Sequence, residues 1–232
     1  ILIFNFFSKM SKNFSKNNSK KKKSKKLALI GMSGAGKSFW SEKIERLGYR
    51  RYSCDDLIAD KLGLKIGAKD KSTLDLAHWM GKPYKEGYLE AESIYLELEK
   101  EVMITICEEL ESCILKNDPV VVDTTGSLIY LNKGLLNRFR SLVRTVHLNL
   151  PVKKHKEFFE VYLSEPKPLI WKGKYIPKEN ESQKSTLRRC YSELLSFRKN
   201  RYISIADCEL DYSFHHCSNT KVNEFLEMVG KF

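Results

Sequence analysis

The sequence predicts an α/β fold in three layers, built on a five-stranded parallel sheet covered by helices. From residue 27 onward, short apolar runs alternate with helical patterns. One of these runs, residues 120–122, consists of three valines, as expected for a strand that is buried on both faces. Alternating strands and helices imply right-handed crossover connections, which make neighbouring strands parallel.

The predicted elements follow one another without an internal repeat. Strands are expected at residues 27–30, 49–53, 120–123, 143–150 and 208–212. Helices are expected at residues 37–47, 55–62, 73–80, 90–115, 131–140, 152–163, 184–206 and 219–229. Together they predict one folded domain over residues 27–232, with a helical lid at about residues 164–190.

Residues 1–26 differ in composition from the rest of the chain. They contain nine lysines and no acidic residue, so that of the formal net charge of +12 only +3 remains for residues 27–232. We expect this segment to be a disordered basic arm. Because the remainder is nearly balanced in charge, contact with nucleic acid is expected only through the arm.

Cysteine usage and hydropathy indicate the compartment. The six cysteines form no C-x-x-C pair, so neither a zinc site nor a disulfide framework is expected. No apolar run has the length of a membrane span. The predicted location is the cytoplasm, where thiols stay reduced. An organelle is the alternative, because the acid-free, serine-rich N-terminus resembles a transit peptide.

A glycine-rich loop follows the first predicted strand. Its sequence, GMSGAGKS, satisfies the pattern G-x-x-x-x-G-K-[ST] and leads into a predicted helix. Phosphate oxygens need several N–H donors that converge on one point, and a chain with few Cβ atoms can wrap around them closely. The following helix adds the positive end of its dipole. We therefore expect ATP to bind through Gly31, Met32, Ser33, Gly34, Ala35, Gly36, Lys37, Ser38 and Phe39.

Three residues of this region are suited to phosphoryl chemistry. Lys37 is expected to reach the β- and γ-phosphates as a catalytic residue, and Ser38 to hold Mg²⁺. A second Mg²⁺ ligand is expected at the end of a neighbouring buried strand, where Asp123 follows the three valines. A helix or turn cap is the alternative role for Asp123. The predicted cofactors are therefore ATP and Mg²⁺.

Two classes of P-loop protein do not fit the sequence. GTPases recognise guanine through N-K-x-D, whereas Asn132 and Lys133 are followed by Gly134 and Leu135. The chain is also too short for the additional elements of a motor or AAA-type ATPase. A small-molecule kinase is the class that remains.

The stretch LALIGMSGAGKSFWSEKIERLGYRRYSCDDLIADKLG resembles the opening of the shikimate kinase family and of its gluconate- and nucleoside-monophosphate-kinase relatives. In that family the second strand ends in Asp-x-Asp. The resemblance places Asp56 on the second aspartate, which contacts the substrate hydroxyl, and so implies a catalytic role for it. The metal-side aspartate falls on Cys54, with Asp55 one position out of register.

The far end of the chain resembles the same family. The segments PKPLIW and LRRCYSELLSFRKNRYISIADCELDY are similar to its lid and closing helix. Lys167 falls where the lid has an arginine, and Arg198 falls on the nucleotide-side arginine. Arg188, Arg189 or Lys167 is expected to enter from the lid and stabilise the transferring group.

The middle of the chain departs from the family. Its F-R-x-x-E motif corresponds to Tyr95, Leu96 and Glu99, so that leucine stands where arginine would bind the carboxylate of shikimate. A leucine cannot supply the paired donors that a carboxylate requires. We therefore expect an acceptor other than shikimate.

Further acceptor residues are expected in two stretches. The family's Gly-Gly-Gly is replaced by residues 125–127, and DTTG resembles the Asp-x-Thr segment of polynucleotide-kinase-like enzymes. Thr124 and Thr125 would place hydroxyls near the γ-phosphate. Trp79 and Tyr84 are candidates for the acceptor pocket, although helix packing explains them equally well. The predicted acceptor-site residues are Asp56, Trp79, Tyr84, Thr124, Thr125, Gly126 and Lys167.

Three functions remain compatible with the sequence. The first is ATP- and Mg²⁺-dependent phosphoryl transfer to a hydroxyl of a small molecule other than shikimate. The second is a nucleotide or polynucleotide 5′-hydroxyl kinase helped by the lysine arm. The third is a non-catalytic nucleotide-binding module. In each case a monomer without a membrane partner is expected.

Overall fold

A five-stranded parallel sheet forms the centre of the protein, as the sequence predicts. The computed structural model describes residues 25–63, 72–112 and 118–231. The strands are β1 (Lys26–Ile30), β2 (Arg50–Ser53), β3 (Val120–Asp123), β4 (Arg144–Leu148) and β5 (Cys208–Leu210). They are hydrogen-bonded in the order β2-β3-β1-β4-β5, and every pair is parallel. The predicted basic arm lies outside the described residues except for Lys25 and Lys26, and Lys26 already belongs to β1.

Helices follow each strand, most of them within a few residues of the predicted positions. They are α2 (Lys37–Glu45), α3 (Cys54–Lys61), α4 (Ser72–Met80), α5 (Tyr88–Glu111), α6 (Lys133–Leu142), α7 (His155–Ser164), α8 (Gln183–Ile205), α9 (Tyr212–His215) and α10 (Val222–Gly230). Two short 3₁₀ turns, η2 (Leu128–Tyr130) and η3 (Val152–Lys154), precede α6 and α7. The predicted strand at 208–212 ends early because Asp211 caps α9, accepting a 2.8 Å hydrogen bond from the Ser213 amide.

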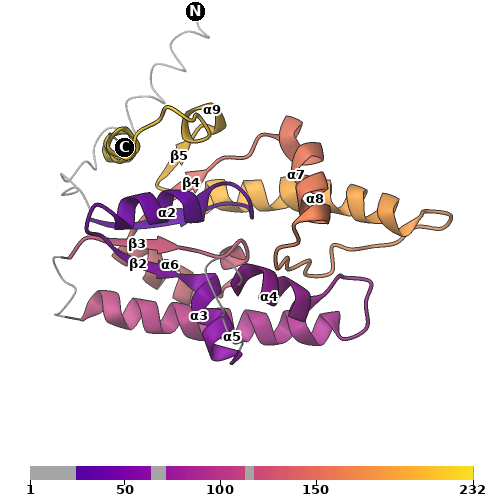
Figure 1. Cartoon of the computed structure of the whole chain (residues 1–232). Helices are drawn as coiled ribbons and strands as arrows, with labels where there is room; N and C mark the ends of the chain where they lie inside the picture. The colour runs from indigo at the N-terminus through magenta and orange to yellow at the C-terminus, as the bar shows by residue number, and fades with distance from the viewer. Residues whose placement is uncertain (1–24, 64–71, 113–117, 232) are drawn as a thin grey trace, which may run out of the picture.

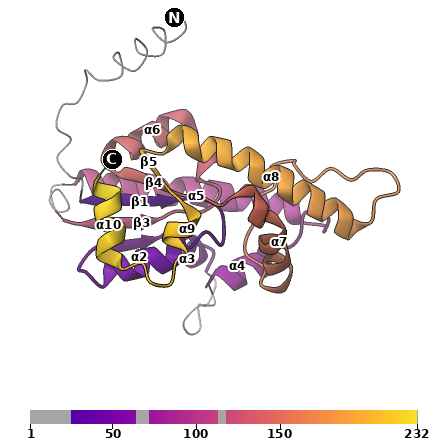
Figure 2. The same cartoon turned by 90° about the horizontal axis from the view of Figure 1, so that it is seen from above.

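Two separate hydrophobic cores cover the two faces of the sheet. Side chains alternate along each strand, so Leu27 and Leu29 face one layer whereas Ala28 and Ile30 face the other. The first layer contains α2 and α10, whose Trp40 and Phe225 stack at 4.2 Å between ring centroids. Figure 1 shows α2 and α5 on opposite sides of the sheet, and Figure 2 shows α10 beside α2. The sheet is the second layer. Helices α3 to α8 contribute to the third layer, and their side chains form the larger core.

The predicted lid is mostly non-helical. Residues 165–182 connect α7 to α8 without helix, and only the start of α8 falls in the predicted range of about 164–190. This connection lies at the carboxyl ends of β1 and β3, where ligands bind in parallel α/β sheets. Within the described part of the chain, no helix combines the length and hydropathy of a membrane span.

Candidate active site

The glycine-rich loop between β1 and α2 curls tightly because its glycines adopt conformations that other residues rarely reach. Gly31 has φ +145° and Gly34 has φ +83°. A Cβ atom at Gly31 would lie 2.9 Å from the Leu148 carbonyl oxygen, and one at Gly34 would lie 2.9 Å from the Phe158 ring. Both positions therefore exclude side chains, so that an anion can approach the backbone of the loop closely.

Lys37 lies at the centre of this loop. Its ammonium donates hydrogen bonds of 3.0 Å to the carbonyl oxygens of Gly31 and Met32, and its side chain is buried. Burial lowers the pKa of Lys37, whereas the nearby carboxylates of Asp123 and Asp55 raise it. The lysine is thus a buried cation placed where the sequence predicts phosphate.

Asp123 ends β3 next to the start of α2. Ser41 connects it to Ser38, because the Ser41 hydroxyl lies 3.2 Å from Asp123 Oδ2 and 3.0 Å from the Ser38 carbonyl oxygen. Oxygen atoms of carboxylates and hydroxyls are the ligands that Mg²⁺ prefers. Asp123 lies close to Ser38, the other residue that the sequence predicts as a Mg²⁺ ligand. Arg51 of β2 is a second partner of Asp123, at 3.5 Å.

A polar pocket opens beside Lys37 and contains Asp55. Tyr95 of α5 donates a 2.7 Å hydrogen bond to Asp55 Oδ1. Burial raises the pKa of Asp55, while the Tyr95 hydrogen bond and the Lys37 charge lower it. The pocket is lined by Ser33, Lys37, Asp55, Tyr95, Gly126, Ser127, Pro168, Ile170 and Arg198. It therefore brings together a carboxylate and a phosphate-loop lysine.

The predicted role of Asp56 requires a correction. The sequence analysis placed Asp56 at the acceptor and Asp55 out of register, but Asp55 is the carboxylate that lines the pocket with Lys37. The reason is helix phase: α3 begins at Cys54, and successive residues of a helix point about 100° apart. A shift of one residue therefore moves a side chain out of the pocket.

The predicted hydroxyls after β3 have structural partners. Thr124 donates a 2.8 Å hydrogen bond to the Leu29 carbonyl oxygen, which joins β3 to β1. Thr125 and Ser127 both donate hydrogen bonds to the buried carboxyl group of Glu99. Of the predicted residues 124–126, only Gly126 lines the pocket. Both threonine hydroxyls thus hold the loop after β3 in place, and their contact with the γ-phosphate stays a prediction.

Glu99 is a buried carboxyl that the sequence analysis did not assign to the site. Burial raises its pKa to about 8, while the hydrogen bond from Ser127 lowers it and the charge of Asp55 raises it. Glu99 lies one helical turn after Tyr95 on α5. Residues with this i, i+4 spacing share one face of a helix, and this was the sequence signal that could have placed Glu99 near the site. Its hydrogen bonds to Thr125 and Ser127 fix the backbone that presents Gly126 to the pocket.

Arg198, the predicted nucleotide-side arginine, lines the pocket together with Lys37 and Asp55. It is buried on α8, and its guanidinium donates to the Ile170 carbonyl oxygen and lies over the Tyr130 ring at 5.5 Å. Its Nε has no protein partner among the described residues. Arg198 therefore retains a donor for a ligand in this pocket.

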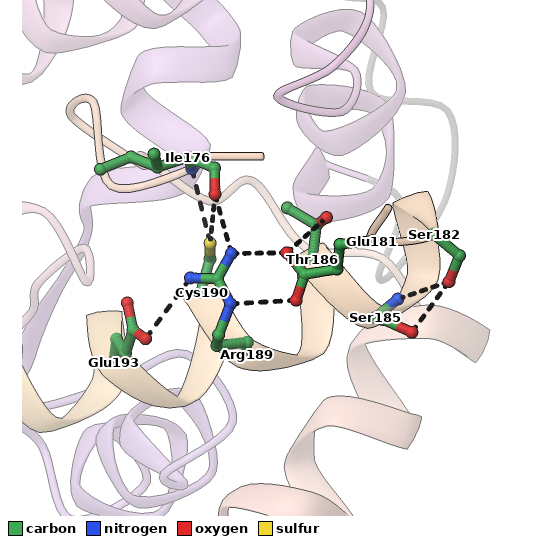
Figure 3. Close-up of polar contacts among 8 residues, drawn as sticks. All are labelled: Ile176, Glu181, Ser182, Ser185, Thr186, Arg189, Cys190 and Glu193. Carbon is green, nitrogen blue, oxygen red and sulfur yellow. Dashed lines mark hydrogen bonds and ion pairs between the residues drawn. The ribbon is translucent and has the colours of Figure 1, made fainter. Parts of the chain in front are cut away.

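The two lid arginines pair with other side chains in this structure, and their catalytic role stays a prediction. Arg188 binds Glu160 of α7 at 2.9 Å. Arg189 donates to both oxygens of Glu181 at 3.0 and 2.6 Å and to the Ile176 carbonyl oxygen at 2.8 Å (Figure 3). A carboxylate of α7 and one of the lid thus pair with the two guanidinium groups, and neither arginine belongs to the pocket lining.

The remaining predicted residues lie around the pocket. Lys167 lines a neighbouring pocket with Ser33, Gly34 and Phe158, at the junction of the loop, α7 and the lid. Trp79 and Tyr84 pack against the larger core, with Tyr84 6.0 Å from Tyr175 between ring centroids. This arrangement agrees with the helix-packing interpretation.

Within the glycine-rich loop, Ala35 and Met32 are buried, whereas Gly36, with φ +93°, precedes α2. Phe39 is 52% exposed beneath the Lys43 ammonium.

Comparison of the chain with known proteins finds similarity in structure but not in sequence. No protein-family model matches it, and no curated protein matches its sequence. A shikimate kinase from Acinetobacter baumannii, solved in complex with shikimate, is similar with a TM-score of 0.56 and 17% identity, covering 88% of this chain and 89% of that chain. A shikimate kinase from Bacteroides thetaiotaomicron is similar with a TM-score of 0.56 and 15% identity, covering 88% and 96%. The chain therefore has the P-loop fold of the shikimate kinases.

Proposed function

We propose that the protein is a kinase that transfers the γ-phosphoryl group of ATP to a hydroxyl of a small molecule, with Mg²⁺ as cofactor. The observation that supports this proposal best is the meeting of Lys37 and Asp55 in one pocket. Phosphoryl transfer depends mainly on positioning and on neutralising the phosphate charge. A phosphate-loop lysine and an acceptor-side carboxylate are the two groups that this chemistry requires.

Each residue then has a defined role. The loop amides and Lys37 bind the phosphates, and Asp55 orients the acceptor hydroxyl and accepts its proton. Because burial raises the pKa of Asp55, its carboxylate is a stronger base than an exposed aspartate. Ser38 and Asp123 would hold Mg²⁺, which neutralises phosphate charge. Lys167 of the lid is a candidate for contact with the transferring group.

The acceptor is expected to differ from shikimate. Leu96, at the position where the resemblance places an arginine, lines a groove with Tyr130 and Lys172 instead of the Asp55 pocket. Arg198 is then the guanidinium available to the acceptor, since its Nε lacks a protein partner among the described residues. Shikimate should therefore support slow ADP release compared with the true acceptor.

A comparison of Lys37→Met with Lys43→Met tests the function. Lys43 lies on the same helix but over the Phe39 ring, outside the phosphate loop. Calorimetry with ATP and Mg²⁺ should show binding for the wild type and for Lys43→Met, with binding weakened at least about tenfold in Lys37→Met. Equal ATP affinity in all three proteins would refute the phosphate-loop assignment.

An ADP-release screen separates the three candidate functions. The acceptors to compare are polyols, sugars, nucleosides, 5′-hydroxyl oligonucleotides and shikimate. Turnover with a small molecule, unchanged after removal of residues 1–24, supports the proposal. Turnover with oligonucleotides that falls steeply with salt or after this truncation would favour the polynucleotide alternative. ATP binding without turnover on any acceptor would favour the non-catalytic module.

A further inference from the structure

The inner part of the lid, residues 169–172, is held from two sides. We call these four residues the inner lid segment. Its Ile170 lines the pocket together with Lys37 and Arg198. On one side, Arg198 of α8 donates a hydrogen bond to the Ile170 carbonyl oxygen. On the other side the segment meets Glu92, a carboxylate of α5 that is only 6% exposed.

Glu92 binds the backbone of the inner lid segment directly. Its Oε1 accepts hydrogen bonds from the amides of Trp171 at 2.6 Å and Lys172 at 2.8 Å. The Tyr88 hydroxyl extends the contact, because it lies 2.7 Å from Glu92 Oε1, 2.8 Å from the Leu169 carbonyl oxygen and 2.9 Å from the Trp171 amide. Hydrogen bonds to a buried carboxylate are shorter and stronger than neutral ones.

The backbone of Lys172 indicates how firmly the segment is held. Lys172 has φ +50°, a conformation that is unfavourable for a residue other than glycine. Such a conformation persists where surrounding contacts determine it. Here the Lys172 amide donates to Glu92, so the contact with Glu92 stabilises the unfavourable backbone.

We propose that Glu92 is a positioning residue that fixes the inner lid segment before nucleotide binds. The segment is then a permanent wall of the pocket that keeps its place during turnover. Lys167, two residues before the segment, is thereby kept at the edge of the phosphate loop. The consequence for catalysis depends on the proposed function, but the fixing of the segment does not.

Amide hydrogen exchange of the full chain without nucleotide tests the proposal. The variants are Glu92→Ala, Glu92→Gln and Tyr88→Phe, with Glu97→Ala as the matched control, because Glu97 lies on the same helix and its exposed side chain pairs with Lys100. The wild type and the control should protect the Trp171 and Lys172 amides. Glu92→Ala should accelerate their exchange at least about tenfold while the amides of the central sheet keep their wild-type protection, with smaller effects for Glu92→Gln and Tyr88→Phe.

Two results would overturn the proposal. One is rapid exchange of these amides in the wild type that slows only when ATP is added, which would mean that the nucleotide orders the segment. The other is unchanged protection in Glu92→Gln and Tyr88→Phe, variants that keep the side-chain volume if Glu92→Ala does not fold. Failure of the wild type to bind ATP would instead refute the proposed function and leave this result untouched.

Activity measurements add a second readout. With the best acceptor of the ADP-release screen, Glu92→Ala should raise the KM for ATP at least about fivefold, with partial recovery in Glu92→Gln. The reason is that ordering the inner lid segment then consumes part of the free energy of ATP binding. A fall in kcat and thermal stability alone, with KM unchanged, would indicate a merely structural residue and contradict the proposal.

Discussion

The hydroxyl of Tyr95 donates a 2.7 Å hydrogen bond to Oδ1 of Asp55, which joins α5 to α3 across the pocket that also holds Lys37. This bond connects the helix that carries Glu92 and Glu99 to the residue proposed to activate the acceptor. It also opposes the effect of burial on the Asp55 carboxyl, since a hydrogen bond to a carboxylate favours the ionised form.

Tyr95→Phe should raise the pKa of Asp55, because it removes the hydrogen bond that lowers it while the burial that raises it remains. The carboxyl carbon of Asp55, followed by NMR over a pH titration, should therefore titrate at higher pH. If Asp55 must be ionised, the acidic limb of the kcat/KM profile should move in the same direction.

Tyr52→Phe is the control for this change, because the Tyr52 hydroxyl bonds to Glu109, away from the pocket. It should leave the titration of Asp55 unchanged. An equal shift in both variants, or none in Tyr95→Phe, would contradict the account of the pocket.

Glu99→Gln should flatten the dependence of stability on pH. The pKa of Glu99 rises from 4.5 to about 8 on folding, so between these values the native protein keeps a proton that the unfolded chain has lost. Stability then falls as pH rises through this window, by at most about 1.4 kcal/mol per pH unit. Urea unfolding at several pH values between about 5 and 8 measures the slope.

The exposed Glu97 provides the comparison for Glu99. Glu97→Gln should keep the wild-type slope, because that carboxyl stays in water and pairs with Lys100. A wild-type slope in Glu99→Gln as well would mean that Glu99 is ionised in the native protein.

Arg51→Met should increase the affinity for a divalent cation. Arg51 lies 3.5 Å from Asp123 Oδ2, and its Nε donates a 2.9 Å hydrogen bond to Ser41. This positive charge opposes a metal at the same carboxylate, so its removal should strengthen Mn²⁺ binding about threefold to tenfold. Electron paramagnetic resonance of free Mn²⁺ measures this without any turnover.

Arg50→Met is the matched variant, because Arg50 is the preceding residue of β2 and pairs with Glu109 at 3.9 Å, away from Asp123. Its Mn²⁺ affinity should equal that of the wild type. Weaker Mn²⁺ binding in Arg51→Met would show that the arginine supports the metal ligands.

Gly34→Ala should destabilise the protein more than Gly48→Ala does. Both glycines have positive φ, +83° and +88°, so alanine is strained at either position by about 1 kcal/mol. At Gly34 the new Cβ would also lie 2.9 Å from the Phe158 ring, whereas at Gly48 it meets nothing within 4 Å. The additional cost at Gly34 should be about 1–3 kcal/mol in urea unfolding.

A double variant checks the cause of the additional cost. Adding Phe158→Leu to Gly34→Ala should recover part of the lost stability, since it removes the ring from the new Cβ. Equal stability losses for Gly34→Ala and Gly48→Ala would mean that Phe158 moves away without cost.

The local features of the chain were predictable from sequence. The stretch GMSGAGKS fixes a phosphate loop because its glycines, Lys37 and Ser38 act together within eight consecutive residues between a strand and a helix. Asp123 was predictable because three valines identify a buried strand and the aspartate marks its end. The order and type of the elements followed from the same periodic patterns.

Features that depend on side-chain partners far apart in the chain were not predictable. Asp55 and Asp56 are adjacent, and the packing of α3 decided which of them enters the pocket. Arg188 pairs with Glu160, 28 residues away, a partner that the sequence does not reveal.

The sequence by itself determined the P-loop fold and the position of Lys37 at the start of the helix after the glycine-rich loop, because contiguous residues and periodic burial encode both. Only the tertiary structure decided that Asp55, and not Asp56, lines the pocket with Lys37. It also decided the partners of the lid arginines and the contact of Glu92 with the amide of Lys172, 80 residues later. The physical reason is that hydrogen bonds and ion pairs act over a few ångströms, so their partners are known only once the helices are packed.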